Sequence, residues 1–282
     1  MGSVPFYAKR FISGSNYEDS LKVVEKLNAN HISVTLDVLG ENVKEKNQVL
    51  KFLEEYETVI KKISEKKLDC YVSIKLTILG LDIDNNFCYE NLCRILKLAD
   101  SNNIRVALDM EGSNYTERTI AMYERVAKEY KSPEIVLQAY LYRTEADINR
   151  VLSANGKIRL CKGAYKESPE KAYQKMSLVV ENYKILIQKL LLRGNRVCIA
   201  THDDKLIDFC SQFIETNKVP KDRYEFQMLY GMREKTWTEI RKSGHNMTVY
   251  VPYGQEWQAY YARRLKERKE NIFFVLKNLF KS

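Results

Sequence analysis

Short apolar runs recur along the chain, and each is followed by a longer segment whose apolar residues repeat with helical period. Eight such runs are present, at residues 32–38, 70–76, 105–110, 134–140, 157–163, 196–202, 224–229 and 246–252. Apolar strands that alternate with helices are typical of parallel sheets that are covered on both faces. We therefore expect eight buried parallel strands.

The segments between these runs predict helices. Residues 41–66 form the first, and residues 173–194 show the clearest helical pattern, which ends at Gly194 as a C-terminal cap. A further helix is expected at residues 16–30, before the first strand. A last helix follows the eighth strand, at about residues 256–279.

Eight strand–helix units in 282 residues predict an α/β fold, a (β/α)8 barrel of the TIM type. We expect one domain over residues 1–282, with about residues 1–30 as an additional N-terminal helical extension. A doubly wound sheet is the alternative, but it usually has fewer strands. Its nucleotide-binding form carries G-x-G-x-x-G after the first strand, where this chain has "DVLGEN".

The composition indicates a folded protein with a basic surface. Hydrophobic residues make up 45% of the chain, and 46 Lys and Arg against 37 Asp and Glu give a net charge of +9. Such a surplus suits anionic ligands, an anionic membrane surface or nucleic acid. Because no dense basic run with interleaved aromatics occurs, we expect no nucleic-acid partner.

The cysteines and the N-terminal sequence indicate in which cellular compartment the protein is expected. The six cysteines form no C-x-x-C pair and several lie in apolar runs, which predicts reduced core thiols in a cytoplasmic protein. Three histidines without an H-E-x-x-H motif predict no metal site. The N-terminus lacks the apolar stretch of a signal peptide, and no apolar run reaches the length of a membrane span.

Large polar residues end or directly follow most of the expected strands. They are Lys75, Asp109, Gln138, Arg159 with Lys162, Thr201 with His202, Gln227, and Tyr250. In a barrel the C-terminal strand ends converge on one rim, which carries the active site. The cations on this rim predict an anionic ligand such as a phosphate, a pyrophosphate or a carboxylate.

The stretch "RLCKGAY" at 159–165 adds a cation and close backbone approach at one strand end. Lys162 followed by Gly163 and Ala164 can bring an ammonium group and backbone N–H groups to a phosphate. A plain strand-to-helix turn is the alternative.

The stretch "YYARRLKE" at 260–267 has two interpretations. On a helix, Tyr260, Arg263, Arg264 and Glu267 fall on one stripe, and Arg263 with Glu267 could be an ordinary surface ion pair. The helix also follows the last strand by a short turn, so its first half should lie near the cationic rim. There, two guanidinium groups and a lysine would form a carboxylate clamp.

Eight short stretches stand in order along the chain, each at an expected strand end or on the last helix. They are "SIKLT" (73–77), "LDME" (108–111), "VLQAY" (136–140), "RLCKGAY" (159–165), "ATHD" (200–203), "FQMLYGMR" (226–233), "VPYG" (251–254) and "YYARRLKE" (260–267). Together they resemble one known family, the proline dehydrogenases. The resemblance runs from about residue 5 to the C-terminus. It implies a flavin-dependent barrel that oxidises L-proline to Δ1-pyrroline-5-carboxylate, the first step of proline catabolism, with FAD as cofactor.

The resemblance also implies roles for individual residues. Asp109 and Arg159 would be the catalytic pair, with Arg159 near flavin N5. Substrate would be held at the carboxylate by Lys75, Arg263 and Arg264, and at the ring by Tyr250, Tyr260, Tyr165 and Leu229. FAD would be held by Met110, Gln138, Arg159, Lys162, Gly163, Ala164, Thr201, His202 and Gln227. Glu267 would support either the arginines or the cofactor, and Asp109 could orient either Lys75 or Arg159.

The family pattern differs at two positions and implies further partners. Gly112 stands where the family often has a second acidic residue, and Cys161 stands where it usually has an aliphatic one. Family members commonly pass electrons to a quinone in the membrane and their product to a pyrroline-5-carboxylate dehydrogenase. Peripheral contact with the inner face of the cell membrane would suit the net charge.

Two other functions fit the same barrel. A lysine Schiff-base aldolase would use Lys75 or Lys162, but it leaves the paired arginines without a role. A basic barrel without catalytic activity would bind anionic membranes or nucleic acid in a salt-sensitive way and carry no flavin.

Overall fold

The computed structural model describes residues 4–131 and 133–267, except the side chains of residues 263 and 265–267. Its centre is a closed barrel of parallel strands in the order β1 to β8. Its strands are β1 (Ser33–Val38), β2 (Cys70–Lys75), β3 (Val106–Asp109), β4 (Pro133–Gln138), β5 (Lys157–Cys161), β6 (Arg196–Ala200), β7 (Tyr224–Leu229) and β8 (Met247–Tyr253). The predicted barrel and its eight strands are confirmed.

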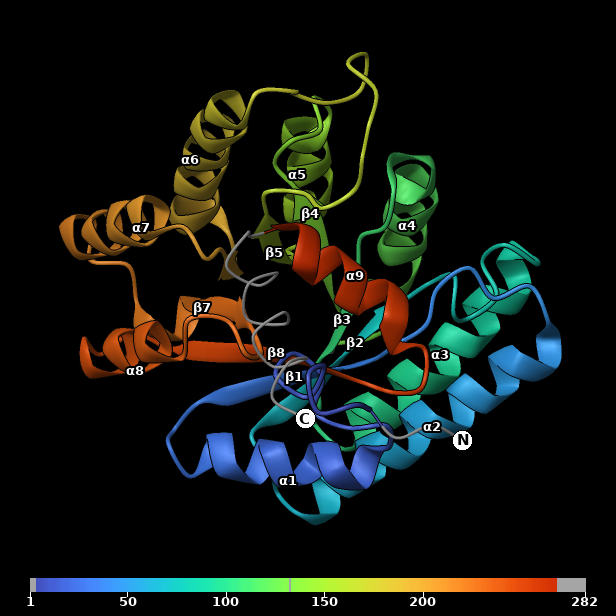
Figure 1. The fold of residues 1–282 in the computed structure, drawn as a ribbon. Coiled ribbons are helices and arrows are strands. Elements are labelled where there is room, and N and C mark those ends of the chain that lie inside the picture. The colour runs from blue at the N-terminus through green and yellow to red at the C-terminus, as the bar shows by residue number, and fades with distance from the viewer. Residues whose placement is uncertain (1–3, 132, 268–282) are drawn as a thin grey trace.

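Helices surround the barrel, one after each of its eight strands (Figure 1). They are α1 (Tyr17–Asn28), α2 (Lys46–Glu65), α3 (Asn85–Ser101), α4 (Ser113–Val126), α5 (Thr144–Ser153), α6 (Met176–Arg193), α7 (Asp204–Thr216), α8 (Glu234–Lys242) and α9 (Trp257–Glu267). Helix α1 precedes β1, as expected, and Gly194 caps α6. The expected last helix begins where α9 begins, and its second half lies outside the described residues.

The strands are buried on both faces, but the two faces differ in chemistry. In β2, Val72 and Ile74 belong to the main hydrophobic core between the barrel and its helices. The alternate residues Tyr71, Ser73 and Lys75 are bonded to residues of other strands inside the barrel. Since successive side chains point to opposite sides of a strand, the period of two explains both sets. Most barrels of this type fill the interior with branched apolar residues, whereas this interior is largely polar.

The charges inside the barrel lie in two groups. The upper ionic layer is defined by Asp37, Lys75, Asp109 and Arg159. The lower ionic layer is defined by Glu134, Glu225, Arg105 and Arg196, at the N-terminal ends of β4, β7, β3 and β6. Four carboxylates therefore balance four cations, which is what burial of charge requires.

Helix α9 crosses in front of the barrel strands in Figure 1, and a second apolar cluster fixes it there. Tyr260 and Tyr261 of α9 pack in this cluster with Ala8, Phe11 and Ile12 of the N-terminal segment. The N-terminal segment therefore holds α9 over the barrel.

The chain crosses itself closely beside this cluster. Gly231 has φ +72°, and a Cβ at this position would lie 1.8 Å from the backbone oxygen of Arg10. Only glycine fits there, because it tolerates a positive φ and carries no side chain.

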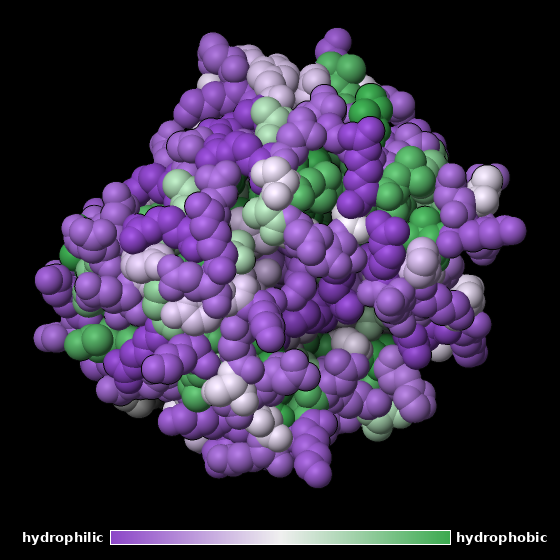
Figure 2. Space-filling model, turned by 180° about the vertical axis from the view of Figure 1, so that it is seen from behind, coloured by the Kyte–Doolittle hydropathy of each residue, from purple (hydrophilic) through white to green (hydrophobic). Residues whose placement is uncertain are grey.

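Figure 2 shows the face of the molecule that lies behind the view of Figure 1. The surface of this face is mostly hydrophilic, and its hydrophobic residues lie in separate small groups.

Candidate active site

A cavity of about 690 Å³ opens at the C-terminal ends of the strands, beneath α9. Its size is in the range of small-molecule and cofactor sites. Every predicted site residue whose side chain is described lines it. These residues are Lys75, Asp109, Met110, Gln138, Arg159, Lys162, Gly163, Ala164, Tyr165, Thr201, His202, Gln227, Leu229, Tyr250, Tyr260 and Arg264. Arg263 and Glu267 lie in α9, but their side chains are outside the described part of the chain.

Arg159 and Asp109 form a buried ion pair at this cavity. Nη1 of Arg159 donates to Oδ1 of Asp109 at 2.8 Å and to the Ser73 hydroxyl at 3.1 Å. Oδ2 of Asp109 accepts from the Tyr250 hydroxyl at 2.7 Å. Of the two partners that the sequence leaves open for Asp109, the structure therefore selects Arg159. Burial and the neighbouring Asp109 charge hold the pKa of Tyr250 well above its usual value, so its hydroxyl stays protonated and donates.

One donor of Arg159 has no acceptor among the described residues. Its Nε–H is buried, although the guanidinium group makes contacts through both terminal nitrogens. A buried donor without a partner costs about 1–3 kcal/mol and calls for an explanation. A ligand in the cavity that Arg159 lines would supply the missing acceptor.

Lys75 is held at the same rim by Asp37. Its ammonium group donates to Oδ1 and Oδ2 of Asp37 at 2.7 and 2.9 Å, and its side chain is 9% exposed. Burial alone would lower the pKa of Lys75, but the charges of Asp37 and Asp109 outweigh burial and raise it. Lys75 is therefore a fixed cation at neutral pH.

Helix α9 supplies the cavity with an arginine and a tyrosine. Arg264 is buried, with its guanidinium carbon 5.1 Å from the centre of the Tyr260 ring. Tyr260 is buried as well. Lys75 and Arg264 thus both bring a cation to the cavity, although they are far apart in sequence.

The connection after β5 forms another wall. Gly163 has φ +117°, and a Cβ there would lie 2.2 Å from the Tyr140 ring, so no other residue fits. Lys162 pairs with Asp203, the N-cap of α7, at 3.2 Å. Lys162, Gly163 and Ala164 therefore all line the cavity, and their approach to a phosphate stays a prediction.

Three further predicted cofactor residues, Gln138, His202 and Gln227, are fixed by bonds to the backbone or to the barrel interior. Gln138 donates to the backbone oxygen of Glu111 at 2.9 Å, and His202 Nε2 accepts from the Leu229 N–H at 2.9 Å. Gln227 donates to the Tyr71 hydroxyl at 2.7 Å. These bonds fix the side chains before any ligand binds.

Five charged residues that line the cavity were not predicted from the sequence: Asp37, Asp203, Asp204, Lys205 and Arg233. Asp37 sits in the first strand, where a polar residue in the run "ISVTLDV" could have indicated it. Arg233 is the last residue of the quoted stretch "FQMLYGMR", and its Nη1 donates to the backbone oxygen of His202 at 2.8 Å. Its φ of +59° is unusual for a residue other than glycine, and a sequence pattern does not show this.

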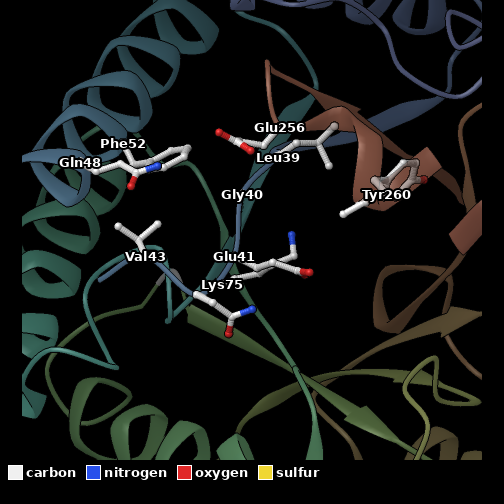
Figure 3. A pocket seen from close by; sticks show the side chains of 11 residues that line it. Leu39, Gly40, Glu41, Val43, Gln48, Phe52, Lys75, Glu256 and Tyr260 are labelled. Atoms are coloured by element: carbon white, nitrogen blue, oxygen red, sulfur yellow. The ribbon is translucent and has the colours of Figure 1, made fainter. Parts of the chain in front are cut away.

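A smaller pocket of about 140 Å³ lies next to the cavity (Figure 3). Lys75 and Tyr260 line both spaces, so they stand at the boundary between them. Glu41 and Glu256 add two carboxylates to the small pocket, from the segment after β1 and from the residue just before α9. The part of the cavity at Lys75 and Tyr260 is therefore flanked by two acidic residues.

Sequence comparisons find relatives over almost the whole chain. The profile of the proline dehydrogenase family matches residues 20–277. Proline dehydrogenase 2 of Bacillus subtilis is 44% identical over 274 residues, which are 97% of this chain and 90% of that protein. Proline dehydrogenase of Deinococcus radiodurans is 33% identical over 279 residues, 97% of this chain and 90% of that protein.

Structural comparison gives the same result. Proline utilization A from Bdellovibrio bacteriovorus, solved after inactivation by N-propargylglycine, superposes with a TM-score of 0.85 at 25% identity. The match covers 92% of this chain and 32% of that longer one. Family profile, full-length relatives and fold agree, and the chain belongs to the proline dehydrogenase family.

Proposed function

We propose that this protein oxidises L-proline to Δ1-pyrroline-5-carboxylate with FAD as cofactor, at the cavity beneath α9. Family membership and relatives at up to 44% identity support the reaction. The single structural observation that carries the proposal is Arg159. Its guanidinium group is buried at the cavity, and its Nε–H has no acceptor in the part of the chain that the structure describes.

The residues present fit a flavin nucleotide. The cavity is of suitable volume, and Lys162, Lys205 and Arg233 bring cations to its β5–β7 side, where a pyrophosphate would find partners. Gly163 lets the backbone come close, and the unpartnered Nε–H of Arg159 suits an acceptor on the flavin ring. When bound, the flavin would accept the hydride from C5 of proline at its N5.

Lys75 and Arg264 hold the substrate at its carboxylate. A carboxylate between an ammonium and a guanidinium group gains charge-assisted hydrogen bonds that fix its direction. We assign a second guanidinium to Arg263, on the sequence pattern of α9, and a supporting role to Glu267. Tyr250 and Tyr260 then wall the pyrrolidine ring, together with Tyr165 and Leu229.

The cations that line the cavity also favour the neutral form of the substrate amine. Free proline is mostly an ammonium ion at neutral pH, and hydride loss from the neighbouring carbon needs the neutral amine. Lys75, Arg159 and Arg264 disfavour a further positive charge in the cavity and so lower the pKa of the bound amine. Arg159, held in place by Asp109, stabilises the negative charge that the cofactor gains.

Lys75 is poorly suited to the alternative Schiff-base chemistry. A nucleophilic lysine needs a lowered pKa, whereas the pairing with Asp37 raises that of Lys75. The observation favours the oxidation over the aldolase reaction.

An absorbance spectrum tests the proposal directly. The purified protein should show a flavin band at about 450 nm that L-proline bleaches without oxygen. D-proline and glycine serve as controls and should leave the band unchanged. A protein that binds no added FAD, or a band that L-proline does not bleach, would contradict the proposal.

We propose further that the electrons pass to a quinone-type acceptor and the product to a pyrroline-5-carboxylate dehydrogenase. None of the helices in the described residues is long and apolar enough to cross a membrane. Contact with an anionic membrane would then be peripheral, in keeping with the net charge of +9. Proline-dependent reduction of a quinone analogue and sedimentation with anionic vesicles test the two parts, and failure of either contradicts that part alone.

A further inference from the structure

The lower ionic layer contains a carboxylate that touches Arg159 from below. Oε1 of Glu134 accepts from Nη2 of Arg159 at 3.3 Å. Asp109 accepts from the other terminal nitrogen, Nη1, at 2.8 Å. The guanidinium group is therefore held by two carboxylates on two different nitrogens, and among the described residues its Nε–H finds no acceptor. Glu134 is fully buried and does not line the cavity.

Glu134 is itself held from below. Its Oε2 accepts from Nη1 of Arg105 at 3.1 Å, and Nη2 of Arg105 donates to Glu225 at 3.3 Å. Arg105 also stacks on the Tyr71 ring, with its guanidinium carbon 3.8 Å from the ring centre. A chain of contacts thus runs from the N-terminal end of the barrel to Arg159.

Burial of this chain is expensive, because carboxylates and guanidinium groups lose their hydration inside the barrel. Apolar residues of similar size fill the same positions in most TIM barrels without that cost. A reason for a charge at Glu134 is therefore needed, and its direct contact with Arg159 supplies one.

We infer that Glu134 is a positioning residue for the reaction: its carboxylate fixes the guanidinium plane of Arg159, so that the unpartnered Nε–H is directed at the bound cofactor. The inference rests on the proposed flavin chemistry. It adds a residue outside the cavity that tunes the cofactor without touching cofactor or substrate.

The midpoint potential of the bound flavin tests this role, because its sign separates two explanations. If Arg159 stayed in place, loss of a nearby negative charge would raise the potential. If Arg159 loses its position, the reduced cofactor loses its stabilising cation and the potential falls. We expect Glu134→Gln to lower it.

The rate gives a second measurement. In Glu134→Gln, reduction of the flavin by L-proline in a single turnover should slow by about tenfold. The proline concentration at half-maximal rate should change by less than about twofold, since Glu134 is remote from the carboxylate clamp. Glu134→Asp retracts the carboxylate but keeps the charge. It should also slow the reduction of the flavin by L-proline. If Glu134→Gln does not fold, Glu134→Asp takes its place in the test.

Asp147→Asn is the matched control. Asp147 is a buried carboxylate of α5 that accepts from Nε of Arg143 at 2.8 Å, and neither of these two residues lines the cavity. It should retain the wild-type rate, and its flavin potential should not fall. Unchanged rates in both Glu134 variants, or equal losses in Glu134→Gln and Asp147→Asn, would overturn the inference. Failure of L-proline to bleach the wild-type protein would instead overturn the proposed function.

Discussion

The upper and lower ionic layers contain the same number of charges, but only the upper layer faces a cavity. Among the described residues, each layer has one arginine whose buried Nε–H has no acceptor, Arg159 in the upper layer and Arg196 in the lower. Lys75 and Arg159 line the cavity, whereas Arg196 pairs with Glu225, which is also bonded to Arg105, Tyr71 and Gln227. The comparison teaches that a buried donor without a partner indicates little about function by itself. Such a donor next to a cavity is what marks the site.

The largest expected effect is on stability, in the lower layer. Glu225→Ala removes the carboxylate that Arg105 and Arg196 share and leaves Arg196 without a carboxylate partner among the described residues, which should cost about 3–5 kcal/mol of the free energy of unfolding. Burial would raise the pKa of Glu225, but Arg105 and Arg196 overcome this and hold it below its usual range. Urea denaturation measures the loss.

Glu65→Ala is the control, because Glu65 makes an exposed pair with Lys62. Its loss should cost less than about 1 kcal/mol. Equal costs for the two variants would show that the lower layer contributes no more than a surface ion pair.

In the upper layer the largest effect should be on the reaction. Arg159→Lys keeps a positive charge but cannot bond Asp109 and Glu134 through separate nitrogens, so kcat/KM for proline should fall roughly 100- to 1,000-fold. Steady-state kinetics with an artificial electron acceptor measures this. Arg196→Lys, at the bottom of the barrel, should stay within about threefold of wild type. A similar fall in both would remove the distinction between the layers.

Glu111 is a buried carboxylate whose titration should make the stability of the protein depend on pH. Its carboxylate accepts from the Thr77 hydroxyl at 2.7 Å, and burial raises its pKa from 4.5 to about 7. A raised pKa means that the folded state favours the protonated acid. Its contribution to stability is therefore full below pH 4.5 and is lost as the pH rises to about 7, by an amount on the order of 3 kcal/mol.

Glu111→Gln should remove that loss, because the amide does not titrate. Urea denaturation at pH 5 and pH 8 gives the difference for both proteins. An identical change in the variant and in the wild type would show that Glu111 does not titrate in this range.

The smallest effect concerns substrate affinity. Arg264→Ala should raise KM for proline by roughly 10- to 100-fold while kcat changes little, since a charge-assisted bond to the carboxylate is lost. Arg193→Ala removes an exposed arginine from the end of α6 and should change neither constant. A KM within twofold of wild type for Arg264→Ala would contradict the carboxylate clamp.

Much of the fold was predictable because it depends on local patterns. The apolar runs predicted all eight strands, and the segments between them predicted helices such as α2 and α6. The sequence did not show that alternate residues such as Tyr71 and Glu134 fill the barrel with polar contacts. The sequence shows which residues of a strand are polar, but the partner of each polar side chain depends on how eight strands close into a ring.

The sequence by itself determined the period of the strands, the order of the elements and the chemistry at the strand ends, because each depends on residues close together in the chain. Only the tertiary structure decided that Asp109 pairs with Arg159, that Asp37 holds Lys75, and that Glu134 lies beneath Arg159. Each of these pairs joins residues on different strands. Burial makes the pairing obligatory, because a charge removed from water must find its counter-charge in the folded barrel.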